Sequence, residues 1–298
     1  MSTRITQNML NSNMMFNLQR SNKAMDKYQT QLSSGKKINK PSDDPVTAVR
    51  GMTYRSALNQ IDQYKRNTDD GTSWMTTTDE AMDQVTQVLQ RVRELTVQGE
   101  NGTNDASART AIAEELDQLK EHLGEIANSQ IAGRYIFAGT AVKTPPYDAE
   151  TKQFTNSNNQ KLELQVGQNN NVQINVLGTD VFNYQGDGSQ GIFKLLDQLV
   201  SEFRSTKPST SGSLDKLDSQ IDNILKERAE LGARMNRMEL SASRIDGLEV
   251  STTSLLSQEE DADISVVITN LKSQENVQKA ALSVGARIIQ PTLMDFLR

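Results

Sequence analysis

The stretch LSSGKKINKPSDDPVTAVR, residues 32–50, lies between two segments whose apolar residues recur at helical spacing. Its glycine suits the residue after a helix C-terminus, and the lysines beside it suit the negative end of the helix dipole. Its first proline cannot continue a helix, whereas the two aspartates can cap a new one with the second proline in its first turn. We therefore predict a joint between two helices. The joint residues are Gly35, Pro41, Asp43, Asp44 and Pro45.

The same stretch could instead hold a phosphate or a metal ion. A phosphate-binding loop is rich in glycine and follows a strand, but this stretch has one glycine and no strand pattern before it. Two adjacent aspartates make a poor cation site, because calcium takes about six to eight oxygen ligands. The sequence therefore favours the joint.

On both sides of the joint, apolar residues alternate in steps of three and four, which is the spacing of a coiled-coil seam. The stripes are narrow, and this favours paired helices over a globular core. The series run from Met14 to Leu32, Tyr54 to Val92, Ile112 to Ile126, Leu214 to Ile245 and Ile264 to Ile288.

The middle of the chain has a different pattern. KLELQVGQNNNVQINV, residues 161–176, alternates apolar and polar residues on both sides of a Gly- and Asn-rich break. This pattern predicts a β-hairpin with a connection of about five residues. A short helix is predicted over residues 191–204, and prolines at 145, 146 and 208 bracket the whole segment.

The predicted fold is mainly α: an elongated, coiled-coil-like helical rod formed by the N- and C-terminal segments, with an inserted small β-rich domain. The predicted parts are a terminal helical domain (1–40 plus 259–298), a helical rod domain (41–144 plus 209–258) and a β-rich outer insert (145–208). The first 40 residues are rich in asparagine, a weak helix former, so the termini are expected to be disordered in the monomer and ordered on assembly. We expect the insert to be dispensable.

The composition argues against catalysis, metal binding and cofactors. The chain has no cysteine and one histidine, His122, so a zinc site has too few ligands. EEDAD, residues 259–263, lacks the spacing of a calcium loop and is expected to form the acidic first turn of the last helix. The first 40 residues are basic although the net charge is -6, and we expect their partners to be acidic neighbours in an assembly rather than nucleic acid or membrane.

Several segments resemble signature segments of the bacterial flagellin family, in the same order along the chain. They cover about the first 140 and the last 90 residues. The segments are QLSSGKKINKPSDDPVTAVR (31–50), VLQRVRELTVQGENGT (88–103), RAELGARMNRMELSASRI (228–245) and EEDADI (259–264) leading to QPTLMDFLR (290–298).

Two departures from the usual flagellin pattern, KPSDDP (40–45) and GRYIFAGT (133–140), resemble the family members that join the flagellar hook to the filament. The resemblance implies an extracellular structural subunit of the bacterial flagellum, secreted through the flagellar type III export channel without a cleaved signal peptide. Flagellin itself, as the main filament subunit, and an unrelated cytosolic coiled-coil scaffold are the alternatives.

The resemblance also implies partners and assembly residues. The implied partners are further copies of the chain in a ring-like homo-oligomer, another hook-associated protein on the hook side, flagellin on the filament side, and a cytoplasmic export chaperone bound through the C-terminal segment. Gly232 is expected to allow close helix packing, and Asn236 and Arg237 to make polar contacts between helices or subunits. The predicted assembly and packing residues are Met9, Leu18, Met25, Leu32, Leu231, Gly232, Asn236, Arg237, Ile288, Leu293, Phe296 and Leu297.

Overall fold

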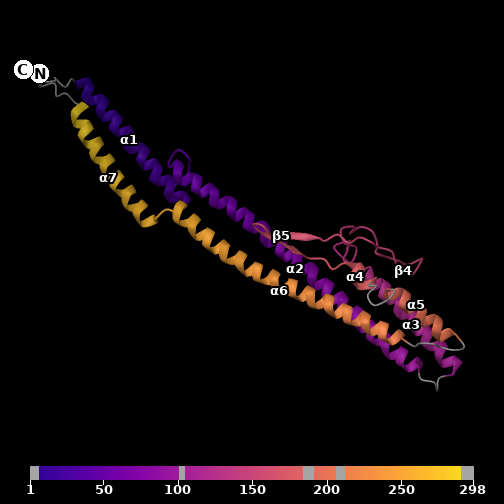
Figure 1. The fold of residues 1–298 in the computed structure, drawn as a ribbon. Coiled ribbons are helices and arrows are strands. Elements are labelled where there is room, and N and C mark those ends of the chain that lie inside the picture. Colours follow the sequence, from indigo (N-terminus) through magenta and orange to yellow (C-terminus); the bar gives the residue numbers. More distant parts are fainter. Residues whose placement is uncertain (1–6, 101–104, 184–190, 206–211, 290–298) are drawn as a thin grey trace, which may run out of the picture. The chain divides into compact units, whose positions relative to one another are not determined.

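The computed structural model describes residues 7–100, 105–183, 191–205 and 212–289. The helices are α1 (Gln7–Ser34), α2 (Pro45–Glu100), α3 (Ala106–Ala127), α4 (Gly178–Phe182), α5 (Ile192–Arg204), α6 (Ser213–Glu260) and α7 (Ile264–Ile289) (Figure 1). The strands are β1 (Gln130–Ile131), β2 (Arg134–Tyr135), β3 (Tyr147–Asp148), β4 (Gln153–Phe154), β5 (Glu163–Gly167) and β6 (Asn170–Gln173). The predicted mainly α fold, with long helices toward both ends of the sequence and a small β-rich insert, is confirmed.

The chain divides into two compact units. Unit 1 comprises residues 1–60 and 248–298, and unit 2 comprises residues 61–247. Helices α2 and α6 therefore contribute residues to both units. The predicted division into a terminal domain, a rod domain and an insert, with boundaries near residues 40, 144, 208 and 258, stays a prediction.

In unit 2, α2 and α6 lie side by side and antiparallel. Arg93 Nε lies 2.6 Å from Asp218 Oδ1 near one end of the pair, and Arg228 lies 3.1 Å from Asp79 and 2.8 Å from Asp83 further along. The heptad positions of both helices face each other and are buried, as the spacing predicts. The buried seam includes Met75, Met82, Val85, Leu89, Leu217, Ile224, Leu231 and Met238.

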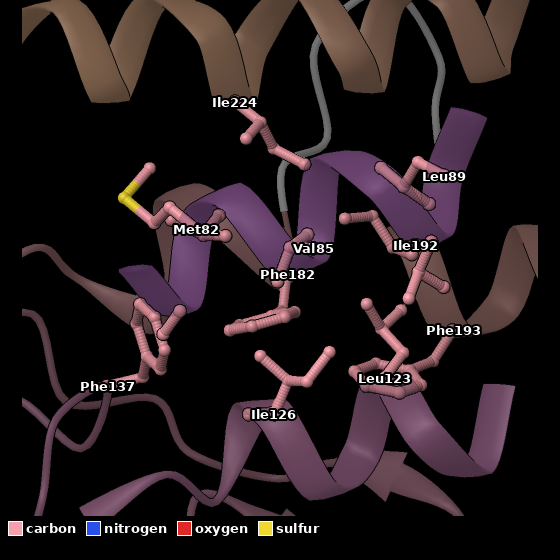
Figure 2. Packing of buried hydrophobic residues seen from close by; sticks show 14 of the residues in the cluster. Met82, Val85, Leu89, Leu123, Ile126, Phe137, Phe182, Ile192, Phe193 and Ile224 are labelled. Atoms are coloured by element: carbon pink, nitrogen blue, oxygen red, sulfur yellow. The ribbon is translucent and has the colours of Figure 1, made fainter. Parts of the chain in front are cut away.

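The segment predicted as an insert shares its core with the helices. The ring of Phe182 in α4 lies 5.1 Å from that of Phe137, at an interplanar angle of 89°. Figure 2 shows Phe182 among side chains of α2, α3, α5 and α6, including Leu123, Ile126 and Ile224. Removing this segment would expose apolar surface on those helices, so the structure argues against our expectation that it is dispensable.

The hairpin formed by β5 and β6 is present, but its connection is shorter than predicted. Leu164 pairs with Val172 and Gly167 pairs with Asn170, so residues 168 and 169 make the turn. Asn169 has a φ of 60°, a conformation that asparagine tolerates well. The alternating pattern missed these pairs because Gly167 and Asn170 lack apolar side chains, whereas the ladder is made by backbone groups.

Candidate functional site

Helices α1 and α7 pack along each other in unit 1. Ser21 Oγ lies 3.4 Å from Gln274 Oε1. Further along the pair, a Cβ added to Gly285 would lie 2.6 Å from Met14 Sδ, so the helices approach closely at this glycine. Residue numbers rise along α7 as they fall along α1, so the two helices are antiparallel.

The joint between α1 and α2 is built as a helix stop followed by a helix start. Gly35 has a φ of 69°, and its N–H donates to Gln31 O at 2.9 Å. Pro45 begins α2, and Asp44 Oδ1 accepts hydrogen bonds from the N–H groups of Val46 at 3.1 Å and Thr47 at 3.3 Å.

Side chains of the joint hold its conformation. The hydrogen bond that the Thr47 hydroxyl donates to Asp44 is the main cause of the lowered pKa of that carboxyl. Asp43 Oδ2 accepts the N–H of Lys40 at 3.0 Å, so it fixes the loop rather than the helix.

The α6–α7 joint, residues 261–263, meets the α1–α2 joint. Lys37 N–H donates to Glu260 O at 2.6 Å, and Ala262 N–H donates to Gly35 O at 2.9 Å. These bonds form an isolated antiparallel bridge between the two joints, centred on Lys36 and Asp261. The two breaks in the helical path are therefore fastened to each other.

Glu260 is the centre of this contact. Its carboxylate accepts hydrogen bonds from Lys36 Nζ at 3.1 Å and from Arg55 Nη2 at 2.5 Å, and its side chain is 9% exposed. Burial opposes ionisation, but the hydrogen bonds from Arg55 and Lys36 outweigh it and lower the pKa of Glu260. Lys36 was expected to serve the α1 dipole, whereas the structure pairs it with this carboxylate.

The residues EEDAD (259–263) were predicted to form the first turn of the last helix, but they lie at the end of α6 and in the joint before α7. Glu259 and Glu260 end α6, and Asp263 precedes α7, where its Oδ1 accepts the N–H of Ser265 at 2.9 Å. The stretch is thus a joint with one capping aspartate rather than the first turn of a helix. The prediction was wrong because α6 continues beyond its heptad pattern.

The predicted assembly residues of α1 fall on two faces. Leu18 and Met25 are half-buried on the face toward α7, whereas Met9 is 57% and Leu32 is 38% exposed. Gln31 is buried instead of Leu32, and its amide donates to Lys37 O at 2.7 Å. The Ile288 side chain, together with Leu293, Phe296 and Leu297, lies outside the described residues.

The predicted residues of α6 also divide. Leu231 is buried in the seam with α2, whereas a Cβ on Gly232 would meet no atom within 4 Å in the described part of the chain. Among the described residues, Gly232 thus has no close packing partner, and its predicted role in packing stays a prediction. Asn236 lines a groove of about 680 Å³ between α2 and α6. Arg237 Nη2 donates to Asn170 Oδ1 at 2.8 Å and so holds the tip of the β5–β6 hairpin.

Apolar side chains remain exposed on both terminal helices after these helices pack together. Phe16 on α1 is 59% exposed and lies seven residues, or two helical turns, after Met9. On α7 a second face carries Val266, Val277 and Val284, each more than half exposed. These side chains are seven or eleven residues apart in the sequence, and the turns of each helix bring them onto one face.

The described residues show no group of three or more His, Asp or Glu side chains that could hold a metal ion. His122 is exposed and lies 3.4 Å from Glu125 on the same helix. None of the helices in the described part of the chain combines the length and apolar character that a membrane span requires.

Both ends of the chain match a known protein family. Residues 5–142 match the bacterial flagellin N-terminal helical region, and residues 214–297 match the bacterial flagellin C-terminal helical region. The chain belongs to the bacterial flagellin family. It is therefore a structural protein of the bacterial flagellum and not an enzyme, and the alternative of an unrelated cytosolic scaffold is wrong.

Individual relatives include both kinds of subunit considered above. Flagellar hook-associated protein 3 of Escherichia coli strain K12 is 27% identical over 277 residues, with 86% of this chain and 87% of that protein covered. Flagellin of Bacillus subtilis strain 168 is 28% identical over 301 residues, with 96% of each chain covered. The crystal structure of flagellar hook associated protein-3 from Legionella pneumophila has a TM-score of 0.63 at 14% identity, covering 70% of this chain and 98% of that one, so it shares the fold.

Proposed function

We propose that this flagellar protein is the subunit that joins the hook to the filament. The observation that carries an assembly function is the exposed apolar surface that remains on α1 and α7 after these helices have packed together. Such stripes, repeated along helices, favour further helix packing with other copies or other subunits. The segments KPSDDP and GRYIFAGT, which resemble the junction members of the family, support the junction rather than the filament.

The proposed partners follow from this position. Copies of the chain form a ring-like homo-oligomer, with another hook-associated protein on one side and flagellin on the other. We propose secretion through the flagellar type III channel, with an export chaperone bound to the C-terminal segment. A chain whose termini fold only when they bind other subunits suits this route. Before assembly it stays monomeric, and its unfolded termini can pass through the channel.

The assembly surface can be tested separately from the fold. Phe16→Ser and Val277→Ser change exposed side chains on two helices, so secondary structure by circular dichroism should be retained. We expect cells carrying both changes in place of the native gene to make hooks but to release flagellin into the medium. Gln19→Ser, which changes an exposed polar residue of α1, is the matched control and should swim normally. Normal filament attachment in the double variant would contradict the proposal.

The filament subunit is the second candidate function, because a flagellin is among the relatives that match almost the whole chain. Antibody labelling of isolated flagella separates the two. A single labelled band between hook and filament supports the junction, and labelling along the full filament supports flagellin. If neither the band nor the filament is labelled, both candidate functions are contradicted.

A further inference from the structure

Glu260 lies where the two joints of unit 1 meet, and five contacts converge there. Its backbone oxygen accepts from Lys37 N–H at 2.6 Å, and its carboxylate accepts from Lys36 at 3.1 Å and Arg55 at 2.5 Å. Ala262 N–H completes the bridge to Gly35 O at 2.9 Å, and Arg50 pairs with the preceding Glu259 at 3.2 Å. A buried carboxylate with two cationic donors is a specific contact, because a side chain of another length would leave charge unpaired.

The backbone of α2 is shaped to admit this carboxylate. Gly51 is buried, and a Cβ at this position would lie 2.4 Å from Glu260 Oε1. Glycine in a helix interior costs about 1 kcal/mol relative to alanine. The pattern of polar residues in the sequence gave no reason for glycine here, and the structure provides one.

We propose that this contact, which we call the Glu260 clasp, fixes the register in which α1 and α7 pair and raises the probability that they pair. The clasp is defined by Gly35, Lys36, Lys37, Gly51, Arg55, Glu260 and Ala262. Each terminal helix begins or ends at a joint, so a bond between the joints fixes one end of the antiparallel pair. The remaining turns of α1 and α7 are then held near each other at a high effective concentration, and one alignment of the two helices is favoured.

Helices α1 and α7 depend on the clasp because the packing between them stabilises their pairing only slightly. Ser21 and Gln31 on α1 are buried polar residues, and the contact of Ser21 with Gln274 is a hydrogen bond of 3.4 Å. Among the described residues of the pair, Val267 and Leu271 are the apolar side chains that are buried. Such limited apolar burial specifies a register poorly, so a slip of one or two turns would cost little without a fixed end. The inference rests on the proposed assembly function for its biological role, since ordered termini matter only if they assemble, but the pairing can be measured without assembly.

The test uses thiol cross-linking in the purified full-length monomer, because the native chain has no cysteine to interfere. Ser21→Cys with Gln274→Cys reports the aligned pair. Ser21→Cys with Ala281→Cys, which lies seven residues or about two turns further along the packed face of α7, reports a slipped pair. A short bifunctional thiol reagent is added, and the rate of intramolecular cross-linking is followed on a denaturing gel. We expect Glu260→Ala to slow the aligned cross-link by about fivefold to thirtyfold and to raise the ratio of slipped to aligned product.

Two further variants make the result specific. Glu259→Ala removes the neighbouring carboxylate, whose partner Arg50 is 60% exposed, and should change the rate by less than about twofold. Gly51→Ala should slow the aligned cross-link as Glu260→Ala does, because its Cβ displaces the carboxylate, although alanine favours the helix. A faster cross-link in Gly51→Ala, or equal rates in wild type and Glu260→Ala, would overturn the clasp.

Failure of the clasp and failure of the proposed function are distinguishable. Labelling along the whole filament would reject the junction while leaving the cross-linking result intact. Equal cross-linking rates with a labelled band at the junction would reject the clasp while leaving the junction intact.

Discussion

The backbone of Gly124 in α3 lies against the ring of Tyr147. A Cβ at this glycine would lie 2.3 Å from Cε1 and 2.4 Å from Cζ of the tyrosine. The tyrosine ring also lies 4.8 Å from that of Phe193 in α5, so it cannot move away without disturbing a second contact. At this residue, helix propensity and packing act in opposite directions.

Gly124→Ala should therefore destabilise unit 2, by about 1–3 kcal/mol, because a rigid ring fills the space that the new methyl group needs. The matched control is Gly232→Ala in α6, where nothing lies within 4 Å of the new Cβ. The control should gain up to about 1 kcal/mol from helix propensity alone. Urea unfolding followed by circular dichroism measures both, and equal shifts in the two variants would contradict the explanation by packing.

Glu227 in α6 is a half-buried carboxyl whose negative charge opposes folding. Burial raises its pKa, and the charges of Asp180 and Glu230 raise it further. Its folded form binds a proton more readily than its unfolded form, so its contribution to stability falls as pH rises through 4.5 toward the raised value.

Glu227→Gln should consequently raise the melting temperature at pH 7 by about 2 °C and leave it nearly unchanged at pH 4, where the native carboxyl is largely protonated. Glu239→Gln at an exposed position of α6 is the control and should show a smaller difference between the two pH values. A gain at pH 4 as large as that at pH 7 would show that the effect is not one of ionisation.

At the scale of the elements, the two aspartates of the joint at residues 35–44 stabilise different parts of the backbone. Asp44 caps α2, whereas Asp43 holds the loop before it through the N–H groups of Asn39 and Lys40. Asp44→Ala should accelerate hydrogen exchange at Val46 and Thr47 by about fivefold, the effect of losing a cap worth about 1 kcal/mol. Asp43→Ala should accelerate exchange at residues 39 and 40 instead. The same exchange pattern in both variants would contradict these roles.

The long helices were predictable because each carries a repeated apolar pattern over many turns. The series from Tyr54 to Val92 and from Leu214 to Ile245 both lie within single helices, α2 and α6. Glycine, proline and aspartate marked the first joint because each has a local conformational preference. Such signals need no knowledge of the partner.

The contacts of the site could not be predicted in the same way. The carboxylate of Glu260 meets Lys36 across 224 residues of sequence, and no local pattern specifies such a pair. The strands β1 to β4 have two residues each, too few for an alternating pattern to be seen. Gly51 and Gly285 carry no local signal in the sequence, because the side chains that come close to them, Glu260 and Met14, lie far away along the chain.

At the scale of the whole molecule, the two units differ in how much apolar surface they bury. Among the described residues, the buried apolar side chains of unit 1 are Val267 and Leu271, whereas unit 2 contains the extended core around Phe182. Because burial of apolar surface offsets the entropy of ordering, unit 1 should be the less stable.

Hydrogen exchange on the purified monomer should therefore be fast over residues 9–34 and 264–286 and slow over residues 75–92 of α2. On assembly, the terminal segments should become protected as their exposed apolar stripes are covered. Slow exchange of the terminal helices in a verified monomer would contradict our proposal that they order on assembly.

The antiparallel pairing of α2 with α6 also has a consequence for synthesis on the ribosome. Arg228 and Asp79 are separated by 149 residues, so α2 leaves the ribosome long before its partner has been made. At about 5–20 residues per second, this delay is on the order of 10–30 s. During that time α3, α4 and α5 can cover one side of α2, but the seam positions that face α6 have no partner from their own chain. We therefore expect this seam to stay open to chaperones until the last third of the protein is translated. Pulsed proteolysis of stalled nascent chains should show full protection of α2 only after residue 231 has emerged.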